Sequence, residues 1–397
     1  MGSSILTNRS AMTALQTLRA IDNNLDKSKD RISTGLRINN AADNTAYWSI
    51  SSMMKHDSNT MSVLVDAINL GREQISIAST AVDLTKEALD NIQQSLVSVN
   101  GKDDGDIAKL QDSIKANMKN IESAVQSSSF AGKNMLANNG QTISVAAGYR
   151  REGTSVYVDM IEIGGEELNF GVMNDGFIDM SEGILGGIFA LSPKDDNPVK
   201  AFIEGIETFQ AAKKAYNDKV QAVQNAKEEL AKSPGDPDKV EALAEAVEDL
   251  NTDEDWANAK QDLRGLADKI SLNDFTQVVI GLNGIGPAGS DEDHPEVSEE
   301  VQRILLGSLQ NKVRNAVDVT LTAGAKIGSA VNLVNTQLEF VKRLQDNVDA
   351  GIGSMIDADM NAESAKLSAL QVQQQLGVQA LSIANQASQN ILFLFRN

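Results

Sequence analysis

The chain has 397 residues, no cysteine, two histidines and a formal net charge of −20. The missing thiols exclude disulfides and cysteine-based zinc clusters, and the acidity argues against nucleic acid as a main partner. No apolar run approaches the length needed to span a bilayer, so no membrane insertion is expected. All six prolines lie between residues 193 and 295, and residues 191–300 hold 25 acidic and 11 basic side chains. The chain therefore divides into proline-free ends and an acidic, proline-bearing middle.

The N-terminal segment repeats an apolar residue every seven positions, at Ala11, Leu18, Leu25 and Ile32. Residues seven apart lie two turns apart on the same side of a helix. The spacing therefore predicts an N-terminal helix with one apolar face.

The strongest pattern runs from Met61 to Val99, where apolar residues recur at alternating steps of three and four before Asn100 and Gly101. A seam held for more than five heptads predicts a long coiled-coil helix. The seam includes Leu64, Ile68, Ile75, Val82, Leu89, Ile92 and Leu96. A second helix is expected over residues 107–125, which also carry one apolar face.

The middle of the chain has ordinary turn punctuation. Residues 141–180 switch to a period of two with interspersed glycines, which predicts a small β-hairpin region. Residues 196–272 regain helical spacing, with a break at residues 233–237. The Gly-, Pro- and acid-rich residues 281–296 are expected to form a loop.

A second seam occupies residues 306–352 and includes Leu309, Val313, Ile327, Val334, Leu338, Val341 and Val348. Two long seams at opposite ends of one chain are satisfied most simply by packing against each other. We therefore expect a mainly α fold. Its main body is a long antiparallel helical coiled-coil bundle formed by both chain ends, with a small β-hairpin region and an outer, partly helical inserted domain.

The C-terminal segment is apolar on two sides. One stripe holds Ala369, Val372, Leu376, Ala380, Ile383, Ala387, Ile391 and Leu394, and the other holds Leu367, Leu370, Val378, Leu381 and Ala384. A single partner helix covers only one face. The segment is therefore either a core helix of a large bundle or a helix whose second face is buried by other subunits. An apolar run almost at the chain end favours other subunits.

No catalytic or metal-binding constellation stands out. The acidic residues 291–296 lack the spacing of a calcium loop, and His56 and His294 have no nucleophile and orienting group beside them in the sequence. We expect no enzymatic activity, no cofactor and no metal. The first nine residues show no charged region followed by an apolar region, so no cleaved secretory signal is expected.

Two distant motifs point to one family. Residues 31–44 (RISTGLRINNAADN) closely resemble the N-terminal signature of bacterial flagellins, and residues 373–392 resemble their C-terminal signature. Residues 356–360 resemble the acidic turn before the last flagellin helix, and the opening residues 4–8 resemble those of alphaproteobacterial flagellins. The resemblance covers roughly residues 1–180 and 300–397.

The resemblance implies a structural subunit that self-polymerises into the helical tubular filament of the bacterial flagellum, for swimming motility. It implies terminal helices at 1–42 and 355–397 in the filament core, and a coiled-coil domain with a β-hairpin at 43–185 and 300–354. Residues 186–299 would form an acidic, variable outer domain. The expected location is extracellular, after type III export. The expected partners are further copies, related flagellins, an export chaperone, and cap and hook-junction proteins.

The resemblance also implies roles for particular residues. Packing in the filament core is expected from Leu18, Leu25, Ile32, Leu367, Leu370, Leu376, Leu381, Ile391 and Leu394. Arg31, Gly35, Arg37 and Asn39 are expected at the turn between the core helices and the coiled coil. Gly35 would either permit that bend or cap the first helix.

Two other functions stay open from the sequence. A flagellar hook–filament junction protein shares the N-terminal motif, although the long C-terminal match favours the filament subunit. A secreted adhesion or binding module would instead act through the acidic middle domain.

Overall fold

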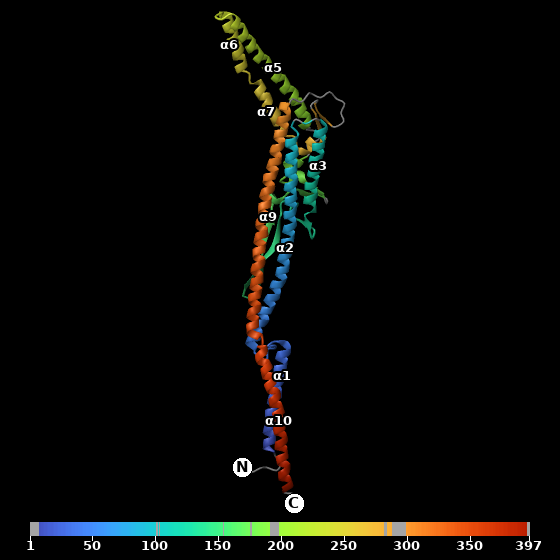
Figure 1. Cartoon of the computed structure of the whole chain (residues 1–397), viewed down its shortest axis with the longest axis vertical. Helices are drawn as coiled ribbons and strands as arrows, with labels where there is room; N and C mark the ends of the chain where they lie inside the picture. Colours follow the sequence, from blue (N-terminus) through green and yellow to red (C-terminus); the bar gives the residue numbers. More distant parts are fainter. Residues whose placement is uncertain are drawn as a thin grey trace. The chain divides into compact units, whose positions relative to one another are not determined.

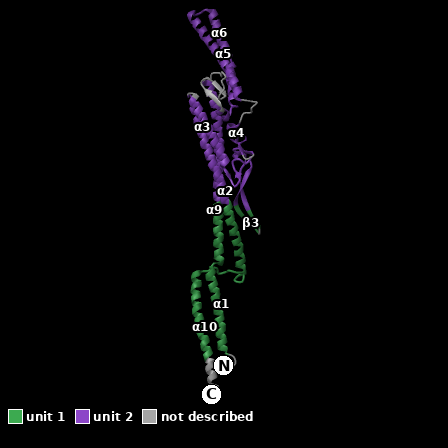
Figure 2. Ribbon diagram, turned by 90° about the vertical axis from the view of Figure 1, so that its right-hand side faces the viewer, with its two compact units in different colours: residues 1–67, 148–157, 337–397 green, residues 68–147, 158–336 purple. Residues whose placement is uncertain are grey.

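The computed structural model of the chain describes residues 8–100, 102, 104–153, 155–174, 177–190, 198–281, 284–287 and 299–394. The fold is mainly α-helical, and no helix in these ranges combines the length and apolar character needed to cross a membrane. The chain forms two compact units (Figure 2). Unit 1 comprises residues 1–67, 148–157 and 337–397, and unit 2 comprises residues 68–147 and 158–336.

The terminal helices of unit 1 are α1 (Arg9–Thr34) and α10 (Met360–Leu394). They lie side by side and run antiparallel, since Asn8 contacts Ala384 while Ser28 contacts Glu363 (Figure 1). Asn8 caps α1 by accepting a hydrogen bond from the Ala11 amide at 3.0 Å.

Two longer helices, α2 (Thr45–Ser98) and α9 (Glu299–Ile356), contribute to both units. They run side by side within each unit (Figures 1 and 2). In unit 1, Ser58 Oγ donates to Asp349 Oδ1 at 2.7 Å. In unit 2, Gly324 faces Val82. The order of these contacts is antiparallel, as the two seams predicted.

The seam residues form the core of this helix pair. Nearly all of them are buried, and Val348 is half-buried against a cluster of Ile38, Ile352 and Ile356. Two buried threonines also occupy seam positions. Thr85 and Thr320 donate their hydroxyls to carbonyls one turn earlier, at Ala81 O and Ala316 O, so their burial leaves no hydroxyl proton unpaired.

A β-hairpin, β3 (Thr142–Glu152) and β4 (Ser155–Gly164), packs along α2. In unit 2 the contact is very close, because a Cβ built on Gly71 would lie 2.0 Å from Val145 Cγ1. In unit 1 the hydroxyl of Tyr149 donates to Asp57 Oδ1 at 2.9 Å, and Arg151 pairs with the same carboxylate.

Unit 2 also contains α3 (Asp104–Ser127), which contacts β6, and several short elements. Small antiparallel pairs are formed by β1 (Ser129–Phe130) with β2 (Lys133–Asn134) and by β5 (Val172–Asn174) with β6 (Phe177–Asp179). Three short helices complete this region: η1 (Glu166–Leu168), η2 (Met180–Glu182) and α4 (Gly186–Phe189). Phe170 is fully buried, and its amide donates to Leu136 O at 2.7 Å, so the segment after η1 is tied to the segment after β2.

The inserted segment is helical, as its spacing predicted. It contains α5 (Pro198–Lys232), α6 (Pro237–Asn251), α7 (Asp255–Ala267) and α8 (Leu272–Gln277), with the break at residues 233–237 between α5 and α6. Ion pairs tie these helices together: Lys219 reaches Asp249 and Asp253, each at 3.1 Å, and Lys213 and Lys260 both contact Glu300.

The expected loop over residues 281–296 is partly wrong. Val278–Gly281 (β7) and Gly284–Pro287 (β8) pair as antiparallel strands. The physical reason is that Val278, Val279, Ile280 and Ile285 favour extended pairing. Gly281 and Gly284 form a paired position of these two strands, although glycine is usually a sign of a loop. The acidic residues 291–296 lie outside the described residues.

Candidate self-assembly surface

One apolar face of α10 is covered by α1. Leu25 of α1 and Leu370 of α10 are buried, while Leu18, Ile32, Leu367 and Leu381 are half-buried. Gly377 lies against Leu18, since a Cβ at Gly377 would lie 3.2 Å from Leu18 Cδ1. The two helices therefore approach closely along a thin apolar seam.

The other apolar face of α10 is open in the single chain. Val372, Leu376 and Ile383 are 56%, 59% and 67% exposed, and Val378 is also exposed. On α1, Met12 and Leu15 are exposed as well. We call Val372, Leu376 and Ile383 the α10 stripe. The predicted core residues of α10 thus divide: Leu376 lies on the open face, whereas Leu367, Leu370 and Leu381 lie toward α1. Leu18, Leu25 and Ile32 are their counterparts on α1. The burial of the Ile391 and Leu394 side chains is not among the described features.

Polar contacts fix the register of α1 on α10. Gln374 Nε2 donates to Asp22 Oδ1 at 2.7 Å, and Asn8 Nδ2 donates to Ala384 O at 3.1 Å. At the opposite end of the pair, the Ser28 hydroxyl and Arg31 converge on Glu363, with Arg31 Nη1 3.7 Å from Glu363 Oε2. The Ser28 hydrogen bond is the main cause that lowers the pKa of Glu363, and Lys366 and Arg31 add to the effect.

The turn after α1 is tied to the end of α9 by the backbone. Gly35 ends α1 in the left-handed conformation at φ +71°, so it caps the helix and turns the chain at once. The Arg37 amide donates to Ile356 O at 2.6 Å, and the Ala358 amide donates to Gly35 O at 2.9 Å. A β-bridge joins Leu36 and Asp357 between these bonds. The segment after α1 and the segment after α9 are therefore joined by backbone hydrogen bonds.

The predicted turn residues act in different ways. Arg37 donates from Nη2 to Met355 O at 2.8 Å, whereas Arg31 contacts Glu363 on α10 rather than the turn itself. Asn39 contributes its backbone: the Asn39 and Asn40 amides donate to Asp43 Oδ2 at 3.0 and 3.2 Å. These two hydrogen bonds lower the pKa of Asp43 because they stabilise the carboxylate.

Sequence reasoning missed several polar residues of this region. Asp43 closes the turn, Asn44 accepts from the Tyr47 amide at the start of α2, and Asp359 accepts from the Asn361 and Ala362 amides at the start of α10. Each stands directly before or within the first residues of a helix, which is the signal of a capping residue. Glu363, one turn after Asp359, has a favourable place near the helix N-terminus.

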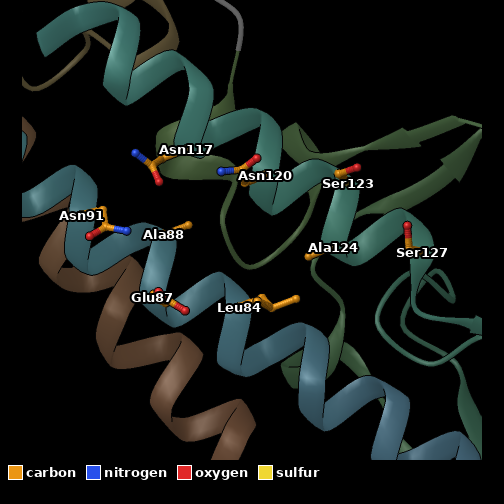
Figure 3. Close-up of a pocket in the computed structure, with 9 residues that line it drawn as sticks. All are labelled: Leu84, Glu87, Ala88, Asn91, Asn117, Asn120, Ser123, Ala124 and Ser127. Atoms are coloured by element: carbon orange, nitrogen blue, oxygen red, sulfur yellow. The ribbon is translucent and has the colours of Figure 1, made fainter.

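An open groove of about 460 Å³ lies between α2 and α3 in unit 2 (Figure 3). The side chains that line it are mostly small and uncharged. Leu84, Glu87, Ala88 and Asn91 come from α2, and Asn117, Asn120, Ser123, Ala124 and Ser127 come from α3. Glu87 has no second ionisable residue beside it in this lining, so the groove lacks a paired acid and base. Within the part of the chain that the structure describes, no three His, Asp or Glu side chains gather as a possible metal site.

Comparisons with known proteins agree with the two terminal motifs. The bacterial flagellin N-terminal helical region matches residues 5–141, and the bacterial flagellin C-terminal helical region matches residues 311–395. The flagellin of Bartonella bacilliformis is 61% identical over 385 residues, which cover 96% of this chain and 97% of the relative. Flagellin D of Rhizobium meliloti is 33% identical over 414 residues, and the flagellin of Brucella melitensis biotype 1 is 31% identical over 393; each alignment covers 99% of both chains. The chain therefore belongs to the bacterial flagellin family.

Proposed function

We propose that the α10 stripe is the surface through which copies of this flagellin pack against one another in a flagellar filament. As a flagellin, the chain is a structural subunit that self-polymerises into the filament of the bacterial flagellum, and it is not an enzyme. The observation that carries the proposal is the open second face of α10: Val372, Leu376 and Ile383 are more than half exposed while the opposite face is covered by α1.

Burial of this face would stabilise a polymer. Transfer of one large apolar side chain out of water contributes roughly 1.5–3 kcal/mol when it is complete. The α10 stripe therefore contributes a few kcal/mol for each subunit, and every subunit in a filament gains it. A contact between two different surfaces of successive copies repeats from copy to copy. When each copy is also displaced along the axis, the arrangement does not close into a ring and forms a helical filament.

The proposal extends to the order of layers in the filament. We place residues 1–42 and 355–397 in the inner core, residues 43–185 and 300–354 around them, and residues 186–299 on the outside. All six prolines and most of the net negative charge lie in the outer segment. Proline breaks long helices, and like charges repel, so both features suit a surface that faces solvent better than a packed helical tube.

The proposed partners follow from the exposed stripe. A chain that polymerises outside the cell needs its apolar face covered before assembly, which suits an export chaperone on the C-terminal helix. Type III export, assembly under a cap, attachment to hook-junction proteins and mixing with related flagellins belong to the same proposal.

A substitution on the stripe tests the proposal. Leu376→Asp places a charge at the centre of the proposed contact, where burial of an unpaired carboxylate is costly. We expect seeded polymerisation, followed by sedimentation and electron microscopy, to be lost, while Leu376→Met polymerises. Val240→Asp is the matched control, because Val240 is 50% exposed on α6 in the proposed outer segment. Normal filaments from Leu376→Asp would contradict the proposal.

A further inference from the structure

A methionine and an arginine meet in unit 1 in an arrangement that filament assembly does not explain. Met53 on α2 is 50% exposed, and its sulfur lies 3.7 Å from Nη2 of Arg151 on β3. The same guanidinium pairs through Nη1 with Asp57, one turn further along α2, and donates from Nε to Gly153 O at 3.1 Å. Arg151 is therefore held in place by the Asp57 carboxylate and by the Gly153 carbonyl while one donor points at the thioether.

The sulfur is accessible to small solutes. Met53 and Arg151 line an open groove of about 310 Å³, together with Trp48, Ser49, Ser52 and His56. All these residues belong to unit 1. A molecule the size of hydrogen peroxide fits such a groove. It can therefore reach both the thioether of Met53 and the guanidinium of Arg151 from solvent.

We propose that Met53 is a preferred site of oxidation by peroxides, and that Arg151 promotes the reaction and holds the product. A sulfur lone pair of Met53 attacks one peroxide oxygen, so the S–O bond forms as the O–O bond breaks. The sulfur loses two electrons and becomes a sulfoxide, and the peroxide is reduced. The departing hydroxide takes the proton of the transferred hydroxyl and leaves as water.

The guanidinium matters at two points of this reaction. Negative charge develops on the departing oxygen, and a fixed cationic donor stabilises it. The sulfoxide oxygen is then a much stronger hydrogen-bond acceptor than the thioether sulfur, which accepts only weakly. Arg151 is a positioning residue for the oxidation, since its own bonds do not change.

The product also alters the contact between β3 and α2. A sulfoxide oxygen on Met53 accepts more strongly from Nη2 than the thioether does, so it draws the guanidinium away from Asp57. The bond from the Tyr149 hydroxyl to Asp57 Oδ1, at 2.9 Å, is untouched. Oxidation therefore weakens one of the two ties that hold β3 to Asp57. Peroxide would therefore control how tightly β3 is bound to α2 at this contact.

Competition among methionines of one chain gives a direct test. The purified full-length monomer is treated with limiting hydrogen peroxide, and the sulfoxide at each methionine is followed over time by peptide mass spectrometry. Met12 and Met160 are both 58% exposed and serve as internal references. We expect Met53 to oxidise faster than both, although its exposed fraction is smaller. Equal or slower oxidation of Met53 would overturn the proposal.

Two variants separate the guanidinium from general loosening of the contact. Arg151→Gln removes the cation, and we expect oxidation of Met53 to slow to the rate of the references or below. Asp57→Asn weakens the tie between β3 and α2 but keeps the cation, so Met53 should stay faster than the references. The same slowing in both variants, or in neither, contradicts a role of the guanidinium.

A second readout follows the consequence. Hydrogen exchange of the β3 amides at residues 148–152 should become faster after peroxide treatment of the wild-type chain. In Met53→Leu, peroxide should leave this exchange unchanged. An equal response in Met53→Leu would show that other methionines cause the change and would overturn the proposed effect on this contact.

Discussion

Gly71 stands within the first seam, where the β-hairpin lies against α2 at very short range. A Cβ at this position would lie 2.0 Å from Val145 Cγ1 and 3.1 Å from Val145 Cβ. Both residues are buried in unit 2. We predict that Gly71→Ala destabilises the packing of β3 on α2, although alanine is the better helix former.

Two effects of opposite sign set the magnitude. Overpacking of a filled core costs about 1–3 kcal/mol. Alanine in place of glycine inside a helix contributes about 1 kcal/mol of stability. The net expectation in the wild-type chain is a loss of roughly 0–2 kcal/mol, and its size depends on how far Val145 can move.

A double-mutant cycle separates the steric cost from the gain in helix propensity. Val145→Ala deletes Cγ1, the atom that a new Cβ would meet most closely, and Cγ2. In that background Gly71→Ala should stabilise unit 2 by up to about 1 kcal/mol. The coupling energy between the two positions should therefore be about 1–3 kcal/mol. Native-state hydrogen exchange of the β3 amides at residues 142–147 measures it locally, because each 1.4 kcal/mol is a tenfold change in the exchange equilibrium. Additive effects would refute the close packing of Val145 on Gly71.

Three further predictions concern the terminal helices. Gly35→Ala should cost about 1 kcal/mol of unit 1 stability, measured by thermal unfolding, because alanine is strained at φ +71°; Gly35→Asn should cost less. The pKa of Glu363 is lowered in the folded state, so its stabilisation of the α1–α10 pair is present above the ordinary glutamate value and is lost as the pH falls below about 4.5. Hydrogen exchange of α10 between pH 3 and 7 should show this loss, and Glu363→Gln should reduce the pH dependence; an unchanged profile would contradict the assignment. Deletion of the residues after Asn385 should leave a soluble protein that forms no filaments in electron microscopy, and normal filaments would contradict that expectation.

The long helices could be predicted from sequence because their burial repeats. The seams at Met61–Val99 and 306–352 place apolar residues on one side for more than five heptads, and such a pattern has few other structural solutions. The two apolar faces of α10 could be predicted for the same reason, because each repeats at helical spacing. The division of the C-terminal stripes between α1 and solvent follows the sequence pattern closely, except that Val378 is exposed.

Contacts between distant backbone groups could not be predicted in this way. The bond from the Arg37 amide to Ile356 O depends on where two chain ends meet, and backbone donors leave no mark in the sequence. Gly71 occupies a seam position without a side chain, and nothing in the sequence indicates that this gap admits Val145. The contact of Met53 with Arg151 joins residues about a hundred positions apart, and neither a methionine nor an arginine in the sequence predicts such a contact.

The central claim is that the α10 stripe is open in the free subunit and covered by other copies in the filament. The chain has no cysteine, so single-cysteine variants report one position each. We expect Val372→Cys, Leu376→Cys and Ile383→Cys to react rapidly with a maleimide in the monomer and to be protected after polymerisation. Val240→Cys, on α6, should react in both states. Equal labelling of the three stripe positions in monomer and filament would contradict the account.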